Sequence, residues 1–168
     1  MKIGDIKPKT PATDESIKNS FASCDSRKKF VADVAGHYKQ HLKKAKHDFS
    51  RGEEEFKELC WDWTIIKAYY SIHHAGNALL SKQKGVFSKD HSCLIIALKY
   101  WGIIDQAFFD RIIKIYEHFS DALSFDIAFQ LRKIGQYSVD EWENLTKEDA
   151  ELILNLAREF LRFVESRL

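Results

Sequence analysis

The stretch that decides the fold is CWDWTIIKAYYSIHHAGNALLSKQKG, residues 60–85. Between Trp61 and Leu80 its side chains are apolar on nearly every face, which is typical of a helix surrounded by other helices. Gly85 can adopt the left-handed conformation that ends a helix. Three glutamates starting at residue 53 suit a first turn, where carboxylates meet the positive end of the helix dipole. We therefore expect a central, buried helix over about 53–84.

Upstream of this helix, one long amphipathic helix is expected. It begins near Ser16 or by Phe30 and breaks at Ser50–Gly52, where the glycine can end it. The apolar positions that define its stripe are separated by steps of four and three; they are Val31, Ala35, Tyr38, Leu42, Ala45 and Phe49.

Downstream, the pattern predicts three or four shorter helices. Ser88 is a candidate N-cap for a helix that ends near Trp101, and the next helix covers about 105–123, with a further helical segment from about residue 124. Thr146, followed three residues later by Asp149, forms a variant of the capping box and opens the last helix. No alternation long enough for a substantial strand occurs.

Length and composition support one all-α domain. The chain has 168 residues, 45% of them hydrophobic, and both of its prolines lie in the first eleven residues, so no proline interrupts the later helices. Residues 1–15 are polar and predict an extended or disordered arm. We expect residues 16–168 to form a compact up-and-down bundle of four to five helices.

The cysteines and the charge restrict location and partners. Three cysteines without CxxC spacing imply neither a zinc ribbon nor a disulfide framework. With no membrane-length apolar run and no leader pattern, the prediction is a cytoplasmic protein. Residues 1–51 carry 12 Lys/Arg against 6 Asp/Glu, within a chain of net charge +1. This basic part could contact phosphate, although a solvated helix face is the simpler interpretation.

The histidines between residues 37 and 47 suggest a metal site, but the residues around them argue against one. His37 and His41 are one helical turn apart, His47 follows, and Asp33 precedes His37 by one turn. The stretch that begins at His41, HLKKAK, is strongly basic and would repel a cation. We therefore expect solvated histidines and no metal.

Other histidines and arginines are candidates for phosphate chemistry. His73 and His74 lie midway along the buried helix, either as hydrogen-bonded core residues or as the lining of a cleft. His91, one turn after Ser88, could face a phosphate at a helix N-terminus. Arg111 and His118 are two turns apart on one face, so they could hold a phosphodiester, with the arginine as phosphate fork and the histidine moving a proton.

Two stretches, KAYYSIHHAGNALLSKQKG with SKDHSCLIIALKY and LRKIGQYSVDEW with the last helix, resemble HEPN domains (higher eukaryotes and prokaryotes nucleotide-binding). In that family an Ala-Tyr-Tyr helix with a histidine precedes a helix opened by Lys-x-His-Ser, and an arginine followed by a tyrosine precedes the final helix. The matching residues here are Ala68, Tyr69, Tyr70, His74, Ala75, Ala78, Leu79, Leu80, Lys89, His91, Ser92, Arg132 and Tyr137.

The resemblance implies a helical bundle that forms homodimers and often pairs with a small nucleotidyltransferase in a toxin–antitoxin pair. Many members resemble metal-independent ribonucleases with an Arg-x(4–6)-His motif. Here Arg132 is followed by Lys-Ile-Gly-Gln-Tyr137 and by no later histidine, while Arg111 and His118 fit the spacing one segment earlier. Arg132 could instead form a structural ion pair.

The function predicted from the sequence is therefore a nucleotide- or RNA-associated binding module without a cofactor. Its candidate phosphate-binding residues are His74, Lys89, His91 and Ser92. Two alternatives stay open: an active ribonuclease that uses Arg132 or Arg111 with His118, His74 or His91, and a helical scaffold without nucleic-acid function.

Overall fold

The computed structural model describes residues 13–123 and 145–168, with side chains up to residue 115 and again from residue 145. The described elements are α1 (Asp14–Ser26), β1 (Phe30–Ala32), α2 (Tyr38–Lys57), α3 (Trp61–Lys84), β2 (Val86–Ser88), α4 (His91–Tyr100), α5 (Gln106–Leu123) and α8 (Lys147–Glu165). The all-α class is confirmed, with six helices in the described ranges rather than four to five. None of the described helices is both long and apolar enough to cross a membrane.

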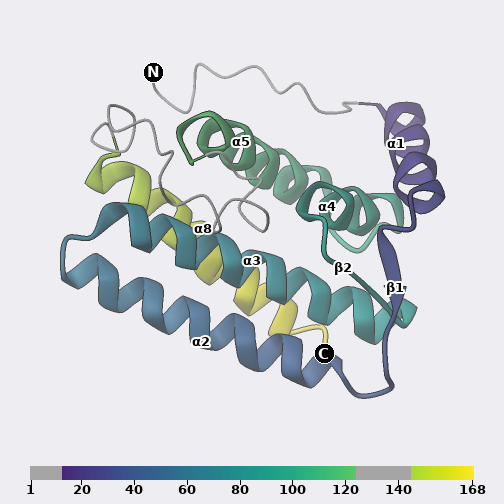
Figure 1. Ribbon diagram of the computed structural model, residues 1–168, viewed down its shortest axis with the longest axis horizontal. Coiled ribbons are helices and arrows are strands. Elements are labelled where there is room, and N and C mark those ends of the chain that lie inside the picture. Colours follow the sequence, from purple (N-terminus) through teal and green to yellow (C-terminus); the bar gives the residue numbers. More distant parts are fainter. Residues whose placement is uncertain (1–12, 124–144) are drawn as a thin grey trace.

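The bundle is organised around α3. In Figure 1, α2 and α3 lie side by side and α8 passes behind them, while α4 and α5 lie on the other side of α3. Helix α1 stands at one edge and packs on α4. The fully buried side chains in this core include Ile65, Tyr69, Ile72, Leu79, Leu80, Leu94, Ile95, Leu98, Phe109 and Phe160.

Helix α3 is the central buried helix, as predicted, and it ends at Gly85, whose φ is +67°. Its predicted start is wrong, because α2 continues through Gly52 to Lys57 and α3 begins only at Trp61. Gly52 is buried inside α2. A Cβ added there would lie 3.4 Å from Leu154 Cδ1 and 3.4 Å from Lys67 Cβ, so the glycine serves close helix packing and not termination.

The single long first helix is also wrong. A short strand, β1, separates α1 from α2 and pairs antiparallel with β2, so that Val31 lies opposite Phe87. The turn into α2 contains Gly36, whose φ of +85° suits glycine. The apolar spacing therefore describes a packed helix face only from Tyr38 onward, and Val31 is largely exposed.

The later helices agree more closely with the sequence. Helix α4 ends next to Trp101 and α5 spans Gln106–Leu123, as predicted. The N-cap of α4 is Asp90, so the prediction of Ser88 is wrong; Ser88 is the buried last residue of β2. The helical segment expected from residue 124 lies outside the described residues.

The capping box of the last helix is confirmed. The Thr146 hydroxyl accepts a hydrogen bond from the Asp149 N–H at 3.2 Å, and the Asp149 carboxylate accepts one from the Thr146 N–H at 3.1 Å. We expect Thr146→Ala to lower the free energy of unfolding by about 1 kcal/mol, because an N-terminal N–H loses its acceptor. Denaturant titration measures this loss. Thr146→Ser keeps the hydroxyl and serves as the control, and an equal loss in both variants would contradict the assignment.

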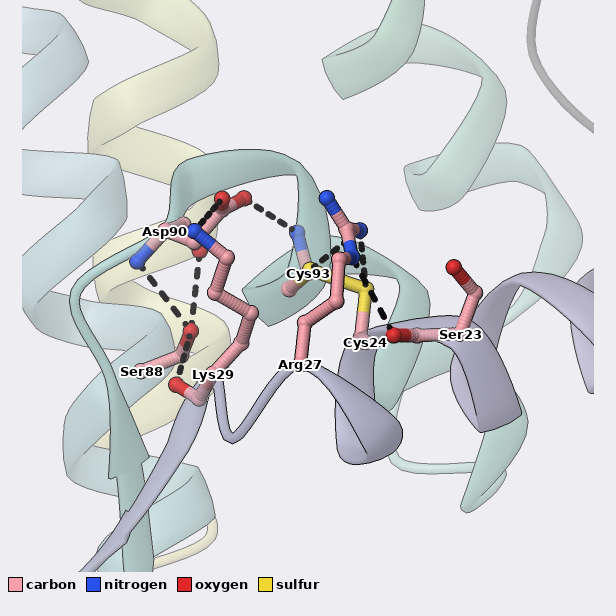
Figure 2. Close-up of polar contacts among 7 residues, drawn as sticks. All are labelled: Ser23, Cys24, Arg27, Lys29, Ser88, Asp90 and Cys93. Atoms are coloured by element: carbon pink, nitrogen blue, oxygen red, sulfur yellow. Dashed lines mark hydrogen bonds and ion pairs between the residues drawn. A yellow bond between two sulfur atoms is a disulfide. The ribbon is translucent and has the colours of Figure 1, made fainter.

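A disulfide joins the edge helix to the bundle, contrary to the sequence-based expectation. Cys24 of α1 and Cys93 of α4 are bonded across a sequence separation of 69 residues, with both side chains buried (Figure 2). No sequence motif predicts a pair this far apart, because only the packing of α1 on α4 brings the two cysteines together. Cys60 is free.

Candidate functional site: a histidine cluster between α2, α3 and α4

Five of the seven histidines lie next to one another along the junction of α2, α3 and α4. His37 and His41 come from the start of α2, His73 and His74 from the middle of α3, and His91 is the first residue of α4. The distances between ring centroids are 5.5 Å for His37–His41, 6.4 Å for His41–His74, 5.4 Å for His73–His74 and 3.9 Å for His73–His91. We call these five residues the histidine cluster.

The inner end of the cluster is attached to β2 through an asparagine. Asn77 accepts a hydrogen bond from the Ser88 N–H (2.8 Å), and its amide nitrogen donates to the Ser88 carbonyl (2.9 Å). The same nitrogen lies 3.1 Å from His73 Nε2. Because an amide nitrogen can only donate, His73 Nε2 accepts and a neutral His73 ring carries its proton on Nδ1.

A buried carboxylate lies beside His74. The Asp48 side chain is 2% exposed; one oxygen contacts Lys44 Nζ at 2.5 Å, and the other lies 3.8 Å from His74 Nε2. A buried, charged side chain of this kind is normally fully paired. Asp48 Oδ2 nevertheless has no hydrogen-bond partner.

The unpartnered polar atoms of the described side chains gather in this one place. Four buried side-chain atoms lack a hydrogen-bond partner there: Asp48 Oδ2, His73 Nδ1, His74 Nδ1 and His91 Nδ1. Buried polar groups in folded proteins are nearly always paired, because an unpaired one costs about 1–3 kcal/mol. Such a concentration of unpaired atoms lowers the stability of the fold at this place, which is typical of a functional site.

The inner histidines are neutral at neutral pH. Burial lowers the pKa of His74 to about 4, although the Asp48 carboxylate opposes the shift. Burial likewise lowers the pKa of His91 to about 4 against the opposing effect of Asp90. The pKa of His73 lies well below its ordinary value, because of burial first and the neighbouring histidines second. These rings therefore offer stacking faces and nitrogens for hydrogen bonds, but no positive charge.

The outer end of the cluster contains a charged carboxylate. Burial raises the pKa of Asp33, but hydrogen bonds from Ser81, His37 and the Val34 N–H outweigh this effect, and the net pKa is lowered. Burial lowers the pKa of His41 more than Asp33 raises it. A neutral imidazole and a carboxylate thus face each other at neutral pH.

The N-terminus of α4 does not offer a free phosphate site. Figure 2 shows the Asp90 carboxylate accepting a hydrogen bond from the Cys93 N–H (3.0 Å) and lying 3.3 Å from Lys29 Nζ. A phosphate at this helix end would have to displace that carboxylate. Lys89 and Ser92 flank it and are exposed, whereas the His91 ring stacks on Tyr69 at 4.6 Å, inside the cluster.

The predicted residues therefore divide into groups. His74 and His91 meet in the histidine cluster, and Lys89 and Ser92 lie on the surface beside it. Arg111 is elsewhere: its guanidinium contacts Glu159 of α8 at 2.8 Å and lies over the Phe108 ring. The side chain of His118, and both Arg132 and Tyr137, lie outside the described residues.

Sequence reasoning missed Asp48 and Asn77, and it did not choose between a core and a site role for His73. A signal for Asp48 was present, because it lies three residues after Ala45 on the apolar stripe of α2. A charged residue on a buried face requires an explanation.

The comparisons with known proteins agree with this bundle. The family model of the HEPN domain matches residues 38–167, from α2 to α8. Four of the five histidines of the cluster lie in this range, whereas His37 and the neighbouring Asp33 lie just before it. No curated protein and no solved structure matches the chain. At the level of the family, the function is that of a nucleotide- or RNA-associated module. The chain belongs to the HEPN domain family.

Proposed function

We propose that this protein is a nucleotide- or RNA-binding HEPN module that does not cleave RNA. The observation that carries the proposal is the gathering of unpartnered buried polar atoms at His73, His74, His91 and Asp48. Such nitrogens and oxygens can pair with the edge of a base. Lys89, an exposed lysine at the edge of the cluster, would add attraction for the backbone phosphates.

The absence of cleavage follows from the protonation and position of the candidate groups. General acid–base catalysis by a histidine contributes roughly 10²–10⁴-fold and works best when the pKa lies near the working pH. His74 and His91, with pKa values of about 4, are not proton donors at pH 7. Arg111 is held by Glu159, and no histidine follows Arg132 in the sequence.

The experiment separates binding from cleavage in one set of variants. Fluorescence anisotropy with a labelled single-stranded RNA measures binding, and gel analysis of the same RNA in chelator measures metal-free cleavage. We expect binding without cleavage by the wild type, and at least tenfold weaker binding by His74→Ala, His91→Gln and Arg132→Ala. His47→Ala, an exposed histidine of α2 outside the cluster, should bind normally.

Three outcomes would replace the proposal. Robust cleavage that Arg132→Ala abolishes would make the protein a ribonuclease with its site near residue 132, and cleavage lost only in Arg111→Ala and His118→Ala would place the site on α5. Binding unaffected by every cluster variant, or no binding at all, would favour a scaffold.

We also propose that the module acts as a homodimer and as the partner of a minimal nucleotidyltransferase in a toxin–antitoxin-type pair. Both parts rest on the properties of the family, and Leu152, an exposed leucine of α8, offers an apolar contact for a second copy. A strictly monomeric mass by light scattering at tens of micromolar protein would contradict the dimer.

A further inference from the structure

We propose that Asp33, His37 and His41 form a binding site for one divalent transition-metal ion of the zinc type. The inference is independent of nucleotide binding, because it concerns the outer end of the histidine cluster, where three potential ligand atoms converge. Asp33 Oδ1 lies 2.7 Å from His37 Nδ1, and Asp33 Oδ2 lies 3.2 Å from His41 Nε2. One ligand atom from each of the three residues lies within 4.8 Å of the others.

These separations suit tetrahedral zinc. With metal–ligand bonds of about 2.0–2.2 Å, the ligand atoms of a tetrahedral site lie roughly 3.3–3.5 Å apart. The His41–Asp33 contact of 3.2 Å is close to this range, and the His37–Asp33 contact of 2.7 Å is about 0.6 Å shorter. An ion could therefore replace the bridging protons if the exposed His37 ring moved outward by that amount. The donor set, two imidazole nitrogens and one carboxylate oxygen, favours zinc and its transition-metal neighbours over magnesium or calcium.

The local fold holds the carboxylate in place before any ion arrives. The backbone N–H of Asp33 donates to the Gly85 carbonyl at 2.8 Å, and its side chain accepts from the Val34 N–H at 2.9 Å. The side chain is 2% exposed, so its position is fixed by the surrounding residues. Partners of this kind orient a ligating carboxylate and tune its affinity.

The helix supplies the two imidazoles from one face. His37 immediately precedes α2 and His41 is one turn further on, so both rings project toward Asp33. Gly36, with φ of +85°, turns the chain between β1 and the helix so that Asp33 can reach back to both. His37 is 47% exposed, which gives an ion access from solvent, and His41 lies deeper, 15% exposed.

Two of the three lysines that argued against a metal in the sequence, Lys44 and Lys46, are paired with carboxylates in the structure. Lys44 contacts the Asp48 carboxylate at 2.5 Å, and Lys46 contacts Glu165 of α8 at 2.5 Å. Lys82, from α3, lies over the Tyr38 ring, 4.6 Å from its centroid. None of these ammonium groups is an unpaired charge directed at Asp33.

A second group of potential ligands provides an internal comparison. Glu55, Glu58 and Cys60 also place their ligand atoms within 4.8 Å of one another. Desolvation first, and then the carboxylates of Glu55, Asp62 and Glu58, raise the pKa of the Cys60 thiol. A raised pKa disfavours the thiolate that binds zinc, so we expect the ion at Asp33.

The test uses the untagged full chain with Zn²⁺ in isothermal titration at pH 7.5, and Co²⁺ as a spectroscopic probe. We expect one Zn²⁺ per chain, no heat with Mg²⁺, and visible Co²⁺ absorption without a thiolate charge-transfer band. Asp33→Asn, His37→Gln and His41→Gln should each weaken binding at least tenfold. His47→Gln and Cys60→Ala should bind like the wild type.

Folding and binding are kept apart by measuring the circular dichroism and denaturant midpoint of each variant without metal. Asp33→Asn keeps the size and hydrogen-bonding shape of the side chain, and the exposed His37 can change without disturbing the core. The proposal is overturned if Zn²⁺ does not bind, if folded variants at all three positions retain wild-type affinity, or if Cys60→Ala alone abolishes binding. RNA binding by a metal-free wild type would leave this result unaffected, so the two proposals can fail separately.

Discussion

Reduction of the Cys24–Cys93 disulfide is expected to lower the free energy of unfolding by about 4 kcal/mol, the value that loop-closure entropy gives for a crosslink of this span. The bond closes a loop with a sequence separation of 69 residues. It also holds α1 on α4, where Phe21 stacks on Tyr100 with a centroid distance of 4.1 Å and meets Trp101 edge-on at 4.8 Å. Without the bond, non-covalent contacts such as these and the buried Ile17 must keep α1 docked.

Denaturant unfolding with and without a reductant measures this effect. Cys24→Ala should unfold at the midpoint of the reduced wild type and should be insensitive to the reductant. Cys60→Ala, which removes the free cysteine, should behave like the wild type under both conditions. Three titratable thiols in the unreduced native protein would contradict the bond, as would a wild-type midpoint that does not respond to reduction.

Acidification from pH 7 to pH 4 is expected to destabilise the fold strongly through the histidine cluster. His74 and His91 have pKa values of about 4 in the folded protein and an ordinary value of 6.5 when unfolded. Between these values the unfolded chain binds more protons than the folded one, so stability is full above about pH 6.5 and is lost as the pH falls toward 4. For His91 the shift corresponds to about 3 kcal/mol.

The pH dependence of the denaturant midpoint, measured from pH 7.5 to 4, checks this expectation. His91→Gln and His74→Gln should flatten the slope between pH 6.5 and 4, because they remove the groups that take up protons on unfolding. His47→Gln should leave the slope unchanged, since that side chain is exposed. A wild-type midpoint that is constant over this interval would show that the cluster is solvated.

The parts of the fold that the sequence predicted correctly depend on neighbouring residues. The burial of α3, its end at Gly85 and the Thr146 cap follow from local composition and from contacts three or four residues apart. The errors come from contacts between distant residues. Gly52 resembles a helix end in the sequence, but the structure shows α8 packed against it. The apolar spacing from Val31 to Phe49 predicts one helix, but its first part lies in a strand that pairs with residues 86–88.

The same division applies to the site. His74 and His91 could be selected from the sequence, but their low pKa depends on burial between three helices, which no local pattern encodes. The basic stretch after His41 suggested that a cation would be repelled, yet Lys44 and Lys46 are paired with Asp48 and with Glu165, the latter 119 residues away along the chain (165 − 46). The spacing of four residues could have indicated Asp48, but only the folded arrangement reveals Glu165 as the partner of Lys46.

The covalent link between Cys24 and Cys93 also determines how the molecule would respond to mechanical force. All five histidines of the cluster, together with Asp33 and Asp48, lie between the two cysteines in the chain. A pull on the chain ends passes from Cys24 to Cys93 through the sulfur atoms, so α2 and α3 carry no tension. An extended residue spans about 3.3–3.6 Å, so the disulfide prevents the 69-residue loop from being extended to its full length of roughly 240 Å. A protease or translocating machine that threads the chain from either end would reach one of the two cysteines before any residue of the site.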